Sequence, residues 1–465
     1  MHNPITEPTN LSISGMRDVI GGKVITPEDP GYDEARKLFY GADRRPTVII
    51  RPADAGEVAH VISVARDTGT ELAVRGGGHS LAAHSISDGG IVLDLSAMKA
   101  MHVDPEERIV WAQTGLTAAE LTKALGDHGL AVGFGDVGSV GIGGITLGGG
   151  VGLLARKHGL TIDSLLAAEI VTADGRVLQV DFESHPDLFW AIRGGGGNFG
   201  VVTRFKFLLA EVDEVYGGML MLPAEPEVIR SFVELADPAP EELSAIANIM
   251  KAPPLPFLPE EQHGKPVLFG IMVYCGDPDA GVDVLSPFRA LADPILDTLA
   301  PMRYQDVYEM MGGEEEAAPT PEAVILRSMF TDIFEDESAE MITEYVGGST
   351  ADMAVAQLRV LGGAVATVPD DATAYAHRDR RIMVNVAAML SDPAETSLHE
   401  QRVDRLAARL RRDPGGVYVN FLGEEGEARV REAYPGPTWQ RLRQVKRRYD
   451  PTNLFRLNQN IPPAS

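Results

Sequence analysis

A histidine follows three glycines in the segment RGGGHS, Arg75 to Ser80, directly after an apolar run typical of a strand. Glycines let successive backbone N–H groups approach a pyrophosphate, because no Cβ blocks the approach. An imidazole at His79 beside such a loop can reach the ring end of a bound dinucleotide. The segment therefore predicts a phosphate-binding loop with a nucleophile next to it, although a lone glycine run after a strand often makes only a turn.

A second segment, Gly135 to Gly152, is unusually dense in glycine. Glycine loses more backbone entropy on folding than any other residue, so this density needs a reason. Flat contact between the backbone and a planar ligand supplies one. A nicotinamide site of the Rossmann type would need an acidic residue about 20 positions further on in a strand–helix–strand unit. That context is missing, so the pattern favours a flavin.

Two more stretches of the sequence contain residues suited to binding a cofactor. The segment LFWAIRGGGGNFGVVTRFKF, residues 188–207, holds another glycine loop followed by Asn198 and a strand. The tail YDPTNLFRLNQNIPP ends the chain with Asn458 and Asn460, whose amides can donate to carbonyl oxygens.

Together the four stretches resemble the vanillyl-alcohol-oxidase-type FAD domain, and within it the berberine-bridge-enzyme-like branch close to bacterial 6-hydroxynicotine-oxidase-like proteins. The shared elements are the RGGGH loop, DLFWA, GNFGVVT and the YDPxNxFRxNxNI ending. The resemblance implies an α+β fold with a two-part FAD-binding domain of the PCMH type. Residues 1–215 would form that domain, and residues 216–416 an α/β substrate domain with an antiparallel sheet over the flavin ring. Residues 417–465 would return to the FAD domain.

The resemblance also implies how FAD is held. The family's 8α-histidyl bond falls on His79, and Val137 stands where many relatives have a second, cysteinyl attachment. Mono-covalent FAD is therefore expected. Val140 occupies a position that in this family goes with O2 as electron acceptor. The residues expected to bind the cofactor are Arg75, Gly76, Gly77, Gly78, His79, Ser80, Gly115, Val137, Gly138, Ser139, Val140, Gly143, Gly144, Gly148, Gly149, Gly152, Asn198, Gly200, Val201, Val202, Asn458 and Asn460.

Hydride transfer to flavin N5 needs a base for the proton of the substrate's heteroatom. Tyr434 matches the region where the family places a catalytic tyrosine, although many relatives read YGxNY there and this chain has Pro435 and Trp439. Tyr418 and Tyr375 are rival candidates. Each of the three could equally be a core aromatic with a satisfied hydroxyl.

The expected reaction is oxidation of an alcohol, sugar or amine carbon, with O2 reoxidising the flavin and releasing H2O2. Two alternatives stay open: an oxidative cyclase or tailoring enzyme of secondary metabolism, and a catalytically silent flavin-binding protein. The sequence fixes neither the substrate nor the oligomeric state.

The overall composition argues against several classes of binding partner. A formal charge of −26 over 465 residues repels nucleic acid and anionic lipid, which also argues against a nucleic-acid role for the basic segment Arg441 to Arg448. The single cysteine, Cys275, allows no intrachain disulfide, and no carboxylate–histidine cluster predicts a metal. The N-terminus shows no secretory signal and no run is long enough to span a membrane, so a cytoplasmic, soluble enzyme is expected.

Several secondary-structure elements are also expected from the pattern. Asp174-Gly175 predicts a hairpin turn, since type I′ turns favour Asp-Gly. Strands are expected at 47–52, 71–76, 91–96, 108–115, 267–276, 381–390 and 417–422, and helices at 54–68, 117–129 and 438–450.

Overall fold

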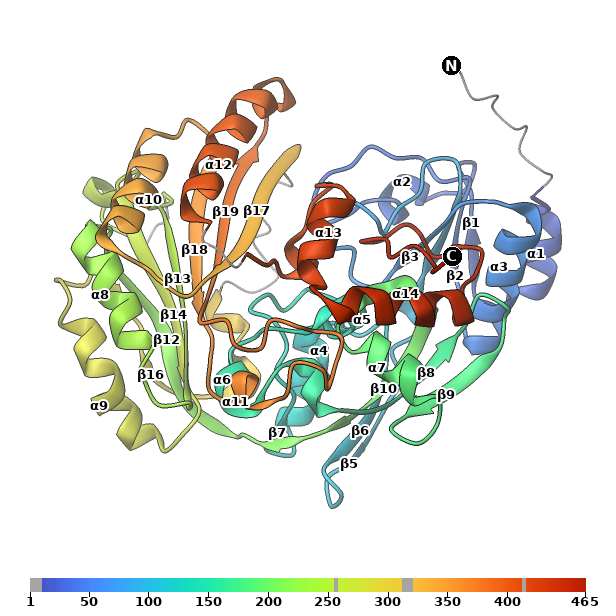
Figure 1. Cartoon of the computed structure of the whole chain (residues 1–465), viewed down its shortest axis with the longest axis horizontal. Helices are drawn as coiled ribbons and strands as arrows, with labels where there is room; N and C mark the ends of the chain where they lie inside the picture. Colours follow the sequence, from blue (N-terminus) through green and yellow to red (C-terminus); the bar gives the residue numbers. More distant parts are fainter. Residues whose placement is uncertain (1–10, 255–257, 312–320, 412–414) are drawn as a thin grey trace.

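A computed structural model describes residues 11–254, 258–311, 321–411 and 415–465. The chain forms two bodies that lie side by side (Figure 1). The first contains a four-stranded sheet in the order β1-β2-β4-β3, parallel except for β1 at its edge. Its strands are β1 (Lys23–Ile25), β2 (Val48–Arg51), β3 (Leu72–Arg75) and β4 (Ile91–Asp94).

A five-stranded antiparallel sheet completes the first body, in the order β5-β6-β10-β8-β9. Its strands are β5 (Met101–Asp104), β6 (Ile109–Gln113), β8 (Leu165–Val171), β9 (Val177–Asp181) and β10 (Val201–Leu208). The hairpin expected at Asp174-Gly175 is confirmed: Thr172 N–H donates to the Arg176 carbonyl at 3.0 Å, and Gly175 has φ +83°. A short pair, β7 (Leu130–Ala131) and β11 (Ala210–Glu211), lies beside it.

Helices fill the spaces around these sheets. The expected helices at 54–68 and 117–129 are confirmed as α3 and α4, the second one ending three residues earlier than predicted. The helices of this body are α1 (Ile13–Val19), α2 (Tyr32–Ala35), α3 (Ala55–Thr68), α4 (Ala118–Gly126), α5 (Ile142–Gly148), α6 (Ala155–His158) and α7 (Pro186–Ile192). Among the described residues, none of the helices has the length and apolar character needed to cross a membrane.

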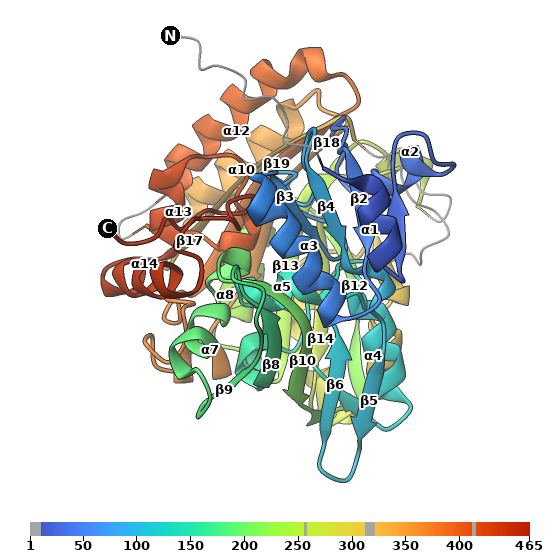
Figure 2. The same ribbon diagram turned by 90° about the vertical axis from the view of Figure 1, so that its right-hand side faces the viewer.

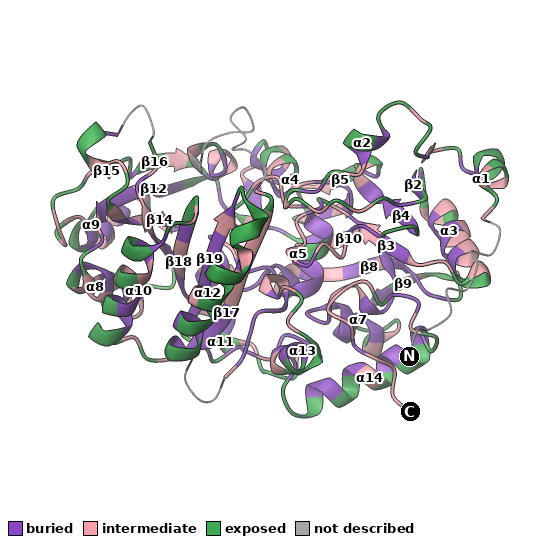
Figure 3. Ribbon diagram, turned by 90° about the horizontal axis from the view of Figure 1, so that it is seen from above, coloured by how far each residue is buried: buried purple, intermediate pink, exposed green. Residues whose placement is uncertain are grey.

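The second body is an eight-stranded sheet in which all neighbouring strands are antiparallel. Its strands are β12 (Glu214–Pro223), β13 (Leu243–Lys251), β14 (Pro266–Tyr274), β15 (Leu296–Asp297), β16 (Ala300–Arg303), β17 (Ala323–Thr331), β18 (Met353–Val360) and β19 (Ile382–Leu390). Four helices cover its outer face: α8 (Pro226–Ala236), α9 (Pro278–Arg289), α10 (Asp336–Gly348) and α12 (Thr396–Leu410). The opposite face is turned toward the first body (Figures 1 and 3), and the short helix α11 (Ala364–Thr367) packs against α6. The predicted antiparallel sheet with flanking helices is confirmed.

The C-terminal segment returns to the first body. Its helices are α13 (Glu427–Ala433) and α14 (Pro437–Tyr449), and α14 lies beside α7 (Figure 2). The predicted basic helix is thus confirmed, but the strand expected at 417–422 is wrong. Val419–Phe421 form a single 3-10 turn, in which Phe421 N–H donates to the Tyr418 carbonyl. The side chains of Tyr418 and Asn420 are hydrogen-bonded to the backbone around α5, and this tertiary anchoring overrides the strand-like alternation.

A buried ion pair fastens this C-terminal segment. Lys446 and Asp450 are both 0% exposed, and Nζ lies 2.7 Å from the Asp450 carboxylate. The same ammonium donates to the carbonyls of Asn198 and Phe455, while Asp450 accepts the N–H groups of Leu454 and Phe455. Because every donor and acceptor of the pair is matched, the pair holds residues 446–455 against the glycine loop at Asn198.

Replacing Asp450→Ala is expected to lower the free energy of unfolding by about 3–5 kcal/mol, because it strands a buried ammonium and two backbone N–H groups. Urea unfolding monitored by circular dichroism measures this loss. Glu427→Ala removes a solvent-exposed pair of the same i,i+4 spacing, Glu427–Arg431, and should cost less than about 1 kcal/mol. Equal losses in the two variants would contradict the structural role of the buried pair.

Candidate active site

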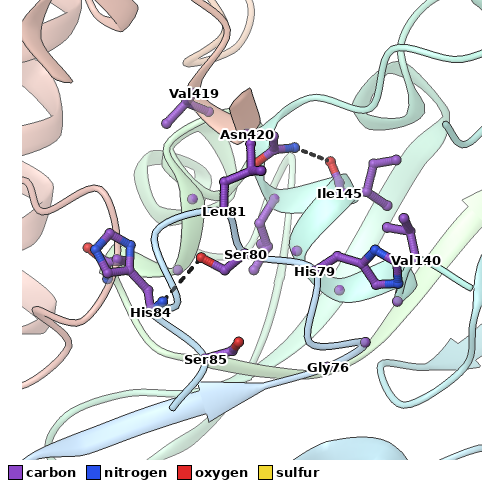
Figure 4. Close-up of a pocket in the computed structure, with 18 of the residues that line it drawn as sticks. Gly76, His79, Ser80, Leu81, His84, Ser85, Val140, Ile145, Val419 and Asn420 are labelled. Carbon is purple, nitrogen blue, oxygen red and sulfur yellow. Dashed lines mark hydrogen bonds between the residues drawn. The ribbon is translucent and has the colours of Figure 1, made fainter. Parts of the chain in front are cut away.

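A cavity of about 450 Å³ lies where the two bodies face each other (Figure 4). This volume is in the range of small-molecule and cofactor sites. Loops of the first body form one side, β17, β18 and β19 form another, and the C-terminal segment closes it. The predicted residues that line the cavity are Gly76, Gly77, Gly78, His79, Ser80, Val137, Val140, Gly143, Gly144, Asn198, Gly200, Val201, Val202, Asn458, Tyr418 and Tyr434.

His79 is held by three neighbours. Its ring stacks on Phe39 at 4.0 Å between centroids, and Tyr40 approaches edge-on at 6.4 Å. Nε2 lies 3.2 Å from the Ser139 hydroxyl. Burial lowers the pKa of His79 to about 4, so the imidazole is neutral at physiological pH. A neutral imidazole keeps a nitrogen lone pair, which is the form that acts as a nucleophile.

The loop around His79 offers unused backbone donors. The N–H groups of Gly77, Gly78, His79 and Ser80 donate to no acceptor within the described part of the chain. Gly78 has φ +73°, which bends the loop so that these groups follow one another, and a Cβ on Gly77 would collide with the backbone of Gly141. Consecutive free N–H groups make a concave anion site. The loop therefore fits the pyrophosphate of a dinucleotide.

Two further glycines leave open space at the wall of the cavity. An added Cβ at Gly144 or at Gly197 would meet nothing within 4 Å, and both residues line the cavity. Side chains there would occupy the space a ligand needs. Asn458 also lines the cavity, and its Oδ1 is buried with no partner among the described residues. These features fit FAD.

Other predicted cofactor residues lie outside the cavity lining, and several of them are closely packed or hydrogen-bonded within the protein. A Cβ at Gly148 would clash with Asn420, and one at Gly152 with the Phe134 carbonyl. Arg75 donates to Asp94 at 2.8 Å and to the Ala35 carbonyl at 2.6 Å, so it anchors the end of β3. Also outside the lining are Gly115, Gly138, Ser139, Gly149 and Asn460, of which Ser139 still contacts His79.

Asn198 lines the cavity but all of its polar atoms are engaged within the protein. Its amide donates to the carbonyls of Gly195 and Gln459, and its Oδ1 accepts from Ile461 N–H at 2.9 Å. It therefore ties the end of the chain to the third glycine loop instead of donating to a ligand.

The three candidate tyrosines occupy different settings. Tyr418 lines the cavity, and its oxygen accepts two hydrogen bonds, from Gly150 N–H and from Asn420 Nδ2, both at 2.9 Å. Tyr434 also lines it, but its hydroxyl donates to the Gly194 carbonyl at 3.1 Å. Tyr375 lies behind Tyr418, outside the lining, with a buried hydroxyl that lacks a partner among the described residues. Of these three candidates, only Tyr418 both lines the cavity and has an O–H without an acceptor among the described residues.

Several lining residues were not predicted. Asn420 contacts Tyr418, while Gln357 and Arg359 of β18 and Asn385 of β19 face the cavity from the second body. Arg359 Nη2 lies 2.8 Å from both carboxylate oxygens of Asp136, and this ion pair joins the two bodies. One signal was available: each of these strands carries isolated polar residues in an otherwise apolar run, which marks a buried polar face.

Comparison with known proteins agrees with this arrangement. Residues 46–181 match the family model of the FAD binding domain, and residues 417–462 match the model named berberine and berberine like. An uncharacterised FAD-linked oxidoreductase of Bacillus subtilis (strain 168) is 31% identical over 454 residues, which cover 95% of this chain and 98% of that protein. (R)-6-hydroxynicotine oxidase of Paenarthrobacter nicotinovorans is 30% identical over 458 residues, which cover 96% of this chain and 97% of the oxidase.

Among solved structures, 6-hydroxy-D-nicotine oxidase from Arthrobacter nicotinovorans superposes with a TM-score of 0.84 at 27% identity, covering 96% of this chain and 98% of that one. Sequence, fold and cavity agree on the same cofactor. The chain belongs to the FAD-linked oxidoreductases, in their berberine-bridge-enzyme-like branch.

Proposed function

We propose that this enzyme is an oxidase that carries FAD through a single covalent bond from His79 and oxidises a small alcohol-type substrate with Tyr418 as the proton acceptor. The observation that carries the proposal is the imidazole of His79, held by Phe39 and Ser139 at the cavity beside four backbone N–H groups that have no acceptor among the described residues. When bound, the flavin would accept a hydride from the substrate at N5 and pass the electrons to O2, giving H2O2.

The residues of this chain would hold the cofactor in two ways. The N–H groups from Gly77 to Ser80 would bind the pyrophosphate, and His79 would be bonded to the 8-methyl carbon of the ring. Val137 offers no sulfur for a second bond, so the attachment would be mono-covalent. Val140 would lie beside the ring, where its small apolar side chain leaves room for O2.

Tyr418 is proposed as the base because of its hydrogen bonds. Burial raises the pKa of its hydroxyl, while the donors at Gly150 and Asn420 oppose that rise by stabilising a phenolate. No acceptor for the Tyr418 hydroxyl is found among the described residues, so the oxygen would be available to exchange a proton with a substrate in the cavity.

We also propose a functional division of the chain near residues 215 and 416, which is supported by the eight-stranded sheet beginning at Glu214 and its last strand ending at Leu390. We propose the cytoplasm as the location, in keeping with a single cysteine that allows no intrachain disulfide.

Anaerobic mixing of the holoenzyme with a panel of alcohols, sugars and amines tests the reaction. At least one compound is expected to bleach the visible flavin band, and air should restore it with one H2O2 formed per product molecule. Bleaching that yields a new carbon–carbon or carbon–oxygen bond would favour the cyclase alternative. Absence of bleaching across the panel would favour a silent flavin-binding protein.

A further inference from the structure

A row of polar side chains crosses the cavity-side face of the second body. Asn248 pairs with Gln357, Gln357 with Asn385, and Asn385 with Ser328, so the four residues lie in register on four adjacent strands. The next row in the same direction is apolar: Met250, Val355, Ala387 and Leu326. Burying a row of polar side chains on an otherwise apolar face of a sheet costs free energy unless each polar group is hydrogen-bonded.

The hydrogen bonds within this row fix the direction of each amide. Gln357 Nε2 donates to Asn248 Oδ1 at 2.8 Å, and Asn385 Nδ2 donates to Gln357 Oε1 at 3.0 Å. Arg359 Nε donates to the same Gln357 oxygen at 2.7 Å. Because Asn385 turns its amide nitrogen toward Gln357, its Oδ1 is the end of the amide that is turned away from Gln357.

That oxygen is left without a partner. Asn385 is 3% exposed and lines the cavity, yet its Oδ1 has no hydrogen-bond partner in the described part of the chain, and it shares this property with Asn458 Oδ1 of the first body. A buried acceptor left unpaired is costly, because it has lost its hydration without a replacement. A ligand with an O–H group in the cavity would satisfy it.

The charge of the cavity wall restricts this ligand further. Asp136 and Arg359 are the only carboxylate and the only guanidinium among the described lining residues, and they neutralise each other. The ring nitrogens of His79 and His84 are neutral, because burial lowers both pKa values to about 4. A charged substrate would therefore lose its hydration without gaining an opposite charge.

We propose that the substrate is an uncharged alcohol with an apolar body and a second hydroxyl, and that this second hydroxyl donates to Asn385 Oδ1. The apolar body packs on Val355, Ala387 and Met389, which line the cavity beside Asn385. Asn385 is thus a specificity-determining residue. The assignment rests on the proposed function, because it presumes that the cavity holds the substrate beside the flavin.

Three matched probes test it with the holoenzyme under anaerobic conditions: 1,4-cyclohexanedimethanol, 4-methylcyclohexanemethanol and 4-(hydroxymethyl)cyclohexanecarboxylate. Perturbation of the flavin spectrum gives each Kd, or the half-saturating concentration where the flavin is bleached. The diol is expected to bind about tenfold more tightly than the methyl compound, since only the diol can satisfy the buried acceptor. The carboxylate should bind most weakly.

The variant Asn385→Leu should abolish the preference for the diol while leaving the Kd of the methyl compound within about threefold, which also shows that the cavity is intact. Asn248→Leu makes the same chemical change in the same row outside the cavity lining, and should keep the preference. The proposal is overturned if Asn385→Leu retains the preference, if the carboxylate binds most tightly, or if the diol does not bind. Because Kd needs no turnover, selective binding of the diol would support the role of Asn385 even if no compound of the panel bleached the flavin, a result that would count against the oxidase proposal alone.

Discussion

The variant His79→Ala is expected to lose all covalently bound flavin, so that the denatured chain has the mass of the bare polypeptide. The imidazole is the only nucleophile in the loop of Gly76 to Ser80 apart from the Ser80 hydroxyl, and it is neutral because burial lowers its pKa to about 4. Intact-mass spectrometry of acid-denatured protein measures the result. Wild-type protein should carry the added mass of one FAD.

His84→Ala is the matched control for this experiment. His84 lines the same cavity, and burial lowers its pKa to about 4 as well. It lacks the stacking on Phe39 and the contact with Ser139 that hold His79 in one orientation. His84→Ala should therefore keep the covalent FAD. A wild-type mass that already equals the bare chain, or covalent flavin persisting in His79→Ala, would refute the attachment site.

The variant Tyr418→Phe is expected to lower kcat by about 10²–10⁴-fold, the usual contribution of a positioned acid–base group. The substrate that bleaches the flavin in the panel serves as the reporter, and the rate of bleaching is measured by anaerobic stopped-flow. In the wild-type enzyme this rate should rise with pH, because only the phenolate can accept a proton and burial raises the pKa of Tyr418. The rate in Tyr418→Phe should not depend on pH in this way.

Tyr375→Phe makes the same chemical change 6.0 Å away, measured between the two ring centroids. The Tyr375 hydroxyl is buried without a partner among the described residues and lies outside the cavity lining, so its loss should change kcat less than about threefold. A larger fall in kcat in Tyr375→Phe than in Tyr418→Phe would contradict the proposal that Tyr418 is the base.

Local chemistry made much of the fold predictable. Asp-Gly between two β-rich runs gave the β8–β9 hairpin, and the spacing of apolar residues gave α3 and α14, because these signals act over a few neighbouring residues. The strand expected at 417–422 failed for the opposite reason. Tyr418 and Asn420 are fixed by hydrogen bonds to Gly150 and Ile145, which lie more than 260 positions away in the chain.

The residues of the site also fall into two groups, those that a local sequence pattern predicts and those that only the fold brings together. His79 and its glycines could be predicted because they form one continuous loop whose function depends on its own backbone. Gly148 and Gly152 lie outside the cavity lining in close contact with Asn420 and the Phe134 carbonyl, and sequence alone does not distinguish a glycine needed for tight packing from one needed for a ligand. Asn385, Gln357 and Asp136 could not be brought together at all, since only the register of β18 and β19 and the approach of the two bodies place them at one cavity.

The hydrogen bonds at Asn198 have a consequence for the order of folding. Ile461 N–H donates to Asn198 Oδ1 and Lys446 donates to the carbonyl of the same residue, so the glycine loop at Asn198 is completed by residues 248 and 263 positions further along the chain. A polypeptide that has been synthesised only as far as the second body lacks these partners. The loop therefore reaches its final hydrogen bonding only after the later segment has been made and has packed back onto the first body.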